Sequence, residues 1–162
     1  MNAHPNAATI ERFYRAFDAC DAETMNAVYA PDATFRDPAF GELHGDEVRA
    51  MWSMLTEQAK DLSVVVRDVV ADDESGSAHW TATYTFTATG RKVVNEIDAT
   101  FRFLGGLVVE HVDDFSFWRW SRQALGPVAI VLGSNPVGQP LVRRRARARL
   151  DAYMAERPAA AD

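Results

Sequence analysis

The chain has 162 residues, a length typical of a single domain, and 48% of them are hydrophobic, which is enough for a sizeable core. Its single cysteine excludes an internal disulfide and a thiolate metal site, and no stretch reaches the ~20 apolar residues that a membrane-spanning helix needs. The net charge of −6 disfavours nucleic-acid binding, although five arginines are concentrated in 143–149. With no basic region and apolar run at the N-terminus, we expect a cytoplasmic protein.

The first third of the chain has the periodicity of amphipathic helices. Apolar residues at the i, i+3, i+4, i+7 spacing predict helices over 7–19 and 46–59. A short helix over 22–29 is expected to end before Pro31, and residues 32–38 are typical of a short strand. The residues that carry the two longer helices are Ile10, Phe13, Tyr14, Phe17, Val48, Met51, Trp52 and Leu55.

The middle of the chain changes to strand patterns. Residues 62–71 form a β-branched run, and residues 77–90 alternate strictly, with threonines on one face and mainly apolar side chains on the other. Two further strands are expected over 92–103 and 107–120, and glycines separate consecutive strands. The sheet is therefore predicted to be antiparallel, and a parallel Rossmann-type sheet is disfavoured because helices and strands do not alternate.

These elements predict an α+β fold, in which the N-terminal helices pack on a strongly curved antiparallel sheet. We expect the helices and the sheet to separate at one end and to leave a conical cavity there. Residues 1–120 form the main domain, 121–157 a helical extension of it, and 158–162 a disordered tail. In the extension, Val142, Ala146, Leu150 and Tyr153 share one helical face, so the arginines are expected to form the solvated face or to contact acidic groups of this chain or of a second subunit.

Residues 7–118 resemble the nuclear transport factor 2-like superfamily, which includes the ketosteroid isomerases and the SnoaL-like polyketide cyclases. The resemblance rests on the order of elements, on "FYRAFDACDAETMNAVYAPDATFRDP" and on "FRFLGGLVVEHVDDF". It implies a cofactor-independent enzyme that moves a proton next to a carbonyl of a hydrophobic small molecule. It also implies a homodimer, which the regular threonine face would permit.

The ketosteroid isomerases suggest roles for three residues. By resemblance, Asp37 of "FRDP" is the base, while Tyr14 and Asp98 donate hydrogen bonds to the substrate oxygen. Strand parity disagrees for Asp98, because it places Asn95 and Phe101 on the apolar face and Asp98 on the opposite face. Unless a β-bulge shifts the register, Asp98 therefore points away from the cavity.

The last strand adds a possible acid–base pair. His111 and Asp113 share parity and are expected to face inward, as polar residues on this strand do in the SnoaL-like cyclases that the chain resembles. Each candidate also has a purely structural interpretation: Asp37 as a turn former, Tyr14 as a core aromatic, and His111 with Asp113 as a satisfied buried pair. The side chains expected to line the pocket are Phe17, Phe35, Phe40, Trp52, Asn95, Phe101 and Phe115.

Our first hypothesis is an isomerase- or cyclase-like enzyme in which Asp37 or the His111–Asp113 pair transfers the proton, and Tyr14 and Asn95 hold the oxygen. A binding or carrier domain for an apolar small molecule is the alternative. An epoxide hydrolase, which would use Asp37, Arg102 and Asp113, is the third possibility, although Arg102 has the wrong parity. The four histidines show no metal-ligand spacing, so no metal site is expected.

Overall fold

The computed structural model describes residues 3–129 and 138–157; the predicted tail 158–162 and part of the apolar segment 124–133 lie outside this range. The helices and strands, in chain order, are α1 (Pro5–Asp18), α2 (Ala22–Asn26), β1 (Tyr29–Asp37), β2 (Gly41–His44), α3 (Asp46–Gln58), β3 (Ser63–Ala71), β4 (Ser75–Phe86), β5 (Arg91–Leu104), β6 (Leu107–Asp114), α4 (Phe117–Leu125) and α6 (Gly138–Glu156).

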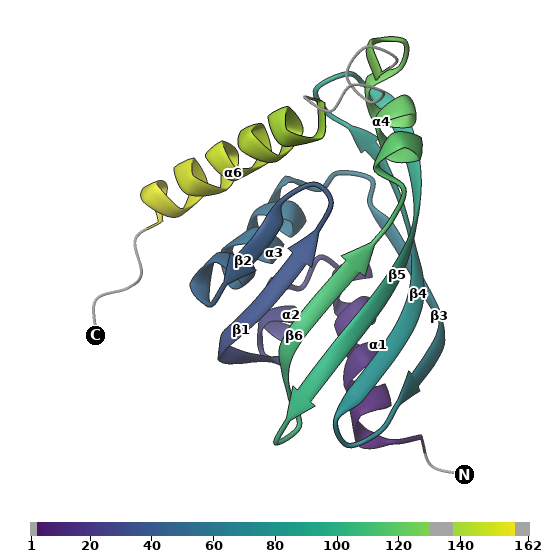
Figure 1. Ribbon diagram of the computed structural model, residues 1–162, viewed down its shortest axis with the longest axis vertical. Helices are drawn as coiled ribbons and strands as arrows, with labels where there is room; N and C mark the ends of the chain where they lie inside the picture. Colours follow the sequence, from purple (N-terminus) through teal and green to yellow (C-terminus); the bar gives the residue numbers. More distant parts are fainter. Residues whose placement is uncertain (1–2, 130–137, 158–162) are drawn as a thin grey trace.

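All six of these strands belong to one curved sheet in the order β2-β1-β6-β5-β4-β3, and helices α1 and α3 pack against its concave face (Figure 1). The α+β fold with a strongly curved sheet is therefore confirmed. Four of the five strand pairings are antiparallel, whereas β1 runs parallel to β6. This parallel pairing was not predicted, and it brings the end of β1 beside the polar strand β6.

The core lies between the helices and the sheet. Ile10, Phe13, Tyr14 and Phe17 of α1 are all buried, because their spacing places them on the face that meets the sheet. From Lys92 to Leu104 burial alternates along β5, so every second side chain of this stretch enters the core, whereas Arg91 at the start of the strand is exposed.

The predicted strand over 107–120 is too long. Strand β6 ends at Asp114, and Ser116 then caps α4 by accepting a hydrogen bond from the backbone N–H of Arg119. Helix α4 packs beside β5, and its Trp120 and Ala124 form a small second core with Val93. The aromatic residues after Asp114 therefore belong to a helix rather than to the sheet.

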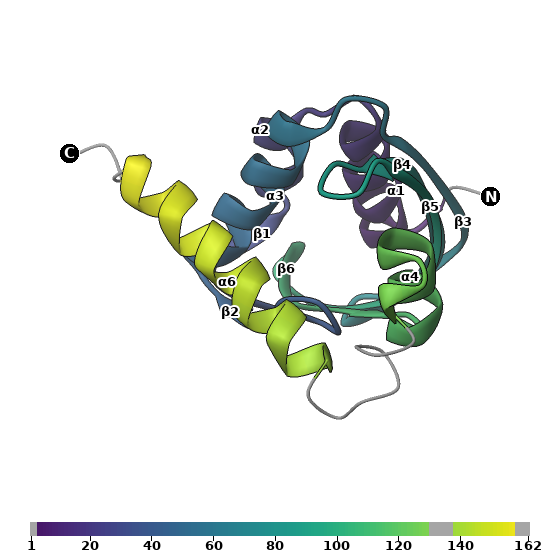
Figure 2. The same cartoon turned by 90° about the horizontal axis from the view of Figure 1, so that it is seen from above.

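Helix α6 lies across α3 and the β1–β2 side of the molecule, as the view from above shows (Figure 2). Leu150 is fully buried and Tyr153 half-buried, which confirms the predicted apolar face. Arg147 of this helix forms an ion pair with Glu47, and Arg157, which follows the helix, forms another with Glu57, so arginines in and just after α6 do contact acidic groups of the same chain.

Candidate active site

His111 of β6 lies at the centre of an aromatic cluster. The sheet register places it opposite Phe35 of β1 on one side and Phe101 of β5 on the other. The imidazole is stacked on Phe101, with ring centroids 4.3 Å apart, and meets Phe35 edge-on at 5.1 Å. Its exposed fraction is 0%. The predicted inward orientation of His111 is therefore confirmed, and the imidazole is enclosed by rings.

A chain of hydrogen bonds runs through this histidine. Trp52 Nε1 donates to the hydroxyl of Tyr29 at 2.9 Å, and that hydroxyl lies 2.7 Å from His111 Nδ1. On the other side of the ring, His111 Nε2 is 2.9 Å from Asp113 Oδ1. Trp80 Nε1 also donates to Asp113 Oδ1, at 3.3 Å. Five buried side chains from four different elements are thus joined in one network.

One assignment of hydrogens gives an acceptor to every N–H and O–H donor in this network. Tyr29 accepts from Trp52, so its own O–H is free to donate to His111 Nδ1. Nε2 then carries the imidazole hydrogen and donates to Asp113. In the opposite assignment, with hydrogen on Nδ1, the Tyr29 O–H would have no acceptor. The network therefore holds His111 as the Nε2–H tautomer and fixes the Asp113 carboxylate.

Tyr14 lies beside this network but takes no part in it. Its hydroxyl is buried and has no hydrogen-bond partner among the residues that the structure describes. Burial, and then the negative charge of Asp113 and the nearby Tyr29, raise the pKa of Tyr14 well above its usual value. The hydroxyl therefore keeps its proton and is available as a donor.

Asp37 ends strand β1, where it shapes a turn and has a raised pKa. Its Oδ1 accepts hydrogen bonds from the backbone N–H groups of Ala39 at 2.9 Å and Phe40 at 2.5 Å, which forms the predicted turn. Burial raises the pKa of Asp37 to about 7, and the charge of Asp113 adds to this shift; the two N–H donors and Arg143 oppose it. A carboxyl group with such a pKa changes charge near neutrality, as a general base must.

The other predicted site residues separate into an inner and an outer group. Asn95 is buried on the same face of β5 as Phe101, as predicted. Asp98 is exposed on the outer face, where its carboxylate lies 2.7 Å from His79 Nδ1, so the inward role that the resemblance suggested is not supported. Arg102 is exposed on that face too and does not join Asp37 and Asp113. Among the predicted lining residues, the buried ones are Phe17, Phe35, Trp52 and Phe101, and the half-buried ones are Phe40 and Phe115.

Sequence reasoning missed two members of the network, Tyr29 and Trp80. Tyr29 was assigned to the short second helix, but it begins β1, and a register irregularity between it and Thr34 hides the strand alternation. Trp80 was correctly placed on the apolar face of β4, but nothing in the sequence shows that its indole reaches Asp113 two strands away. Ala99, which lies opposite Asp113 on the intervening β5, is small enough to leave that path open.

Two pockets lie at the surface of the molecule. A pocket of about 460 Å³ lies between α1 and β3 and reaches Tyr14; its other lining residues include Glu11, Arg15 and Asp18. The second, of about 540 Å³, lies outside the core near α4. Neither pocket is lined by Asp37 or Asp113, so the conical cavity stays a prediction.

Within 3–129 and 138–157 no group of His, Cys, Asp and Glu side chains forms a possible metal site. No helix in these ranges is long and apolar enough to cross a membrane.

Comparison with known proteins gives a family and a fold. The family model described as a SnoaL-like domain matches residues 10–111. A search of curated proteins found no match. Many solved structures are similar to this chain.

An NTF2-like protein of unknown function from Burkholderia pseudomallei is 23% identical over 74% of this chain and 97% of its own, with a TM-score of 0.65. IdmH, a putative polyketide cyclase from Streptomyces antibioticus, is 22% identical over 74% and 98%, with a TM-score of 0.63. An LEH-like epoxide hydrolase from M. tuberculosis is 17% identical over 80% and 96%, with a TM-score of 0.63. At these identities the structures share the fold, and helix α6 lies beyond the region that the family model matches.

Proposed function

This chain belongs to the SnoaL-like domain family, and we propose that it is a cofactor-independent enzyme that moves a proton next to a carbonyl group of a hydrophobic small molecule. A polyketide-like or steroid-like ring is the expected substrate class. The family and its fold are consistent with this chemistry, and the residues of the interior supply the specific support.

Each of three residues has a distinct role in this proposal. Asp37, with a pKa of about 7, removes a proton from the carbon next to the carbonyl and returns it to a conjugated carbon. Tyr14 donates a hydrogen bond to the carbonyl oxygen, where negative charge develops as the enolate forms. Asp113 is a positioning residue: His111 and Trp80 hold its carboxylate, and its charge raises the pKa of both Asp37 and Tyr14.

The observation that carries the proposal is the buried Tyr14 hydroxyl, which lacks a partner in the described part of the chain. A buried unpaired hydroxyl destabilises a fold by about 1–3 kcal/mol, whereas phenylalanine at this position would avoid that cost. A ligand oxygen bound beside Tyr14 would remove the penalty and would lie within reach of the charge of Asp113, which acts on both Tyr14 and Asp37.

The test uses a β,γ-unsaturated 3-ketosteroid and an aromatic polyketone as probes. Formation of the conjugated product and uptake of deuterium from D₂O next to the carbonyl report on proton transfer. We expect Asp37→Asn to lower kcat by about 10²- to 10⁴-fold and Tyr14→Phe by about 10²- to 10³-fold. The rate of the wild-type protein should rise with pH through about 7, because Asp37 must be ionised to act as a base.

Asp98→Asn is the matched control, because it removes an exposed carboxylate from the other face of the sheet. It should leave kcat within about twofold of wild type, which corresponds to a change of about 0.4 kcal/mol in the activation barrier. If Asp37→Asn and Tyr14→Phe turn over the probes as fast as Asp98→Asn does, neither residue belongs to the mechanism.

A binding or carrier domain remains the second candidate, because every nitrogen of His111 already has a protein partner and the network needs no substrate to be complete. Such a protein would bind the same apolar probes without exchanging deuterium and without the rise in rate through pH 7.

The homodimer that the sequence suggested also stays a prediction. The exposed Val65 and Val94 beside the threonine face are consistent with a contact between subunits there.

A further inference from the structure

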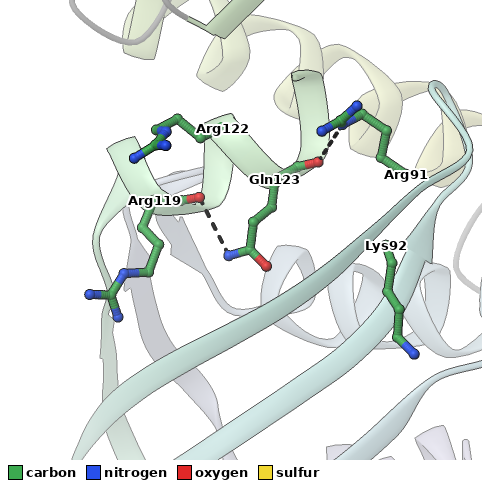
Figure 3. A pocket seen from close by; sticks show the side chains of 5 residues that line it. All are labelled: Arg91, Lys92, Arg119, Arg122 and Gln123. Carbon is green, nitrogen blue, oxygen red and sulfur yellow. Dashed lines mark hydrogen bonds between the residues drawn. The ribbon is translucent and has the colours of Figure 1, made fainter. Parts of the chain in front are cut away.

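Four cationic side chains line one pocket at the edge of the sheet, away from the interior site. Arg91 and Lys92 come from the start of β5, Arg119 and Arg122 come from α4, and Gln123 lies between them (Figure 3). The pocket has a volume of about 540 Å³. This concentration of positive charge occurs in a chain whose net charge is −6.

These four cations have no carboxylate within 4 Å in the part of the chain that the structure describes. Other arginines of the same chain do: Arg49 lies 3.6 Å from Asp46, and Arg67 lies 2.6 Å from Asp68. The carboxylate of Asp61 is near enough to interact weakly with the charge of Lys92. That carboxylate already accepts hydrogen bonds from the backbone N–H and the hydroxyl of Thr85. Positive charges that line one pocket without a counter-charge repel, and an anion bound among them would reduce that repulsion.

The framework beneath these side chains is fixed by hydrogen bonds. Strand β6 ends opposite Asp98, which leaves the edge of β5 open at Val94. The Gln123 amide fills that place: its Oε1 accepts from Val94 N at 2.8 Å and its Nε2 donates to Val94 O at 3.0 Å. These two hydrogen bonds fix Gln123 of α4 to the edge of β5 in the same way as a neighbouring strand would bind there.

Arg91 is held as part of the same framework. Its Nε donates to the carbonyl of Gln123 at 2.9 Å, near the C-terminus of α4, where a cation is favoured by the helix dipole. Gly126 allows this approach, because a Cβ at that residue would lie 2.9 Å from Arg91 Cζ. Arg119, Arg122 and Lys92 make no comparable side-chain hydrogen bond within the described residues, so their charged ends can turn toward a ligand (Figure 3).

We propose that this basic pocket binds the anionic group of a small molecule, a phosphate ester or a polycarboxylate, at a site separate from the interior one. Guanidinium groups match the paired oxygens of phosphate and carboxylate, and three or four cations can share one multiply charged group. The volume also falls within the range of about 300–1,000 Å³ that is typical of small-molecule sites.

Isothermal titration calorimetry with inorganic pyrophosphate, at low ionic strength, tests this site directly. We expect saturable binding to the wild-type protein and at least a tenfold weaker Kd for the double variant Arg119→Gln/Arg122→Gln. The matched control is Arg144→Gln/Arg145→Gln, which removes two exposed arginines from α6 and should bind pyrophosphate like wild type. Adding 0.5 M NaCl should weaken the binding, because exposed charges are screened over a few ångströms at that concentration.

A parallel titration with citrate distinguishes the two sources of negative charge. Tighter binding of pyrophosphate supports a phosphate ester as the natural ligand, whereas equal or tighter binding of citrate supports a polycarboxylate. The proposal is overturned if neither anion binds at millimolar concentration, or if the α6 control weakens binding as much as the α4 variant does. Should the α4 variant fail to fold, Lys92→Gln, an exposed single change in β5, repeats the test with the same criteria.

Discussion

Tyr14 and Tyr29 are both buried, but their hydroxyl groups have opposite surroundings. The Tyr29 hydroxyl is held between Trp52 Nε1 and His111 Nδ1, whereas the Tyr14 hydroxyl has no partner within the described ranges. Removing a buried group that is unpaired relieves its desolvation penalty. Removing one that is paired leaves its partners unsatisfied.

The Tyr→Phe substitution should therefore have opposite effects at these two positions. We expect Tyr14→Phe to raise the free energy of unfolding by about 1 kcal/mol, and Tyr29→Phe to lower it by about 2–4 kcal/mol, because Trp52 and His111 both lose a partner. Urea denaturation of the two variants measures the difference. Equal destabilisation by both substitutions would mean that the Tyr14 hydroxyl has a partner after all.

Parity was a good guide to individual residues on the sheet and a poor guide elsewhere. It placed Asn95, His111 and Asp113 inward and Asp98 outward, and the structure agrees. It could not show that Asp37 is both a turn former and a carboxyl group of raised pKa, because the turn depends on local backbone donors while the pKa depends on burial and on Asp113. The second condition arises from residues distant in sequence, so no local pattern contains it.

Helix α6 is attached to the body by few apolar contacts and several polar ones. Leu150 is its only fully buried side chain among the described residues, and the ion pairs of Arg147 and Arg157 lie near the surface. Surface ion pairs contribute about 0–1 kcal/mol each, so Leu150 supplies much of the attachment. Arg143 of α6 also packs over Gly41, so closely that a Cβ added at Gly41 would lie 3.1 Å from Arg143 Cδ.

Leu150→Ala should consequently loosen α6 without unfolding the sheet. We expect amide hydrogens in 143–156 to exchange at least tenfold faster, while exchange in β5 changes little, because the helix can detach locally. Hydrogen exchange with mass spectrometry resolves the two segments. Leu104→Ala, at an exposed leucine of β5, is the matched control; equal acceleration of both segments in Leu150→Ala would show that α6 and the sheet unfold together.

Elements were predicted best where one periodicity was unambiguous. The helices near 7–19 and 46–59 and the strands near 62–71 and 92–103 were placed to within a few residues. The two helices and the second strand each have a single period over ten residues or more, and the strand near 62–71 is marked by its β-branched composition. The segment after Asp114 fits two periods: its aromatic residues alternate, but Phe117, Trp120 and Ala124 also have helical spacing. Ser116 decides between them by capping the helix, and the small core formed with Val93 stabilises it.

Titratable groups on both faces of the sheet affect the stability of the whole molecule in the same direction. Asp37 has a raised pKa in the folded state, so its ionisation between about pH 4 and pH 7 progressively destabilises the fold. On the outer face, hydrogen bonds with Glu96 and Asp98 raise the pKa of His79, so the stability that its protonated form contributes is lost as pH rises through the folded pKa. The chain also becomes more negative as pH rises, which adds repulsion.

Other carboxyl groups set a lower limit to this trend. Hydrogen bonds lower the pKa values of Asp21, Asp61 and Asp72, so the stability that they contribute is present above about pH 4 and is lost as pH falls below it. The two sets of groups together predict maximum stability at about pH 4–5, rather than at neutrality.

Urea midpoints measured from pH 4.5 to pH 8.5 test this prediction on the intact protein. The midpoint of the wild-type protein should fall from about pH 4.5 to pH 7 as Asp37 ionises, and should fall further at higher pH as His79 loses its proton. The midpoint of the double variant Asp37→Asn/His79→Gln should be nearly flat, because both groups that lose stabilising protons are gone. The Asn side chain can still accept the N–H groups of Ala39 and Phe40, so the turn is preserved. Asp32→Asn removes an exposed carboxylate of the same strand and should keep the slope of the wild-type protein; if the double variant keeps it too, the decline with pH originates in groups other than Asp37 and His79.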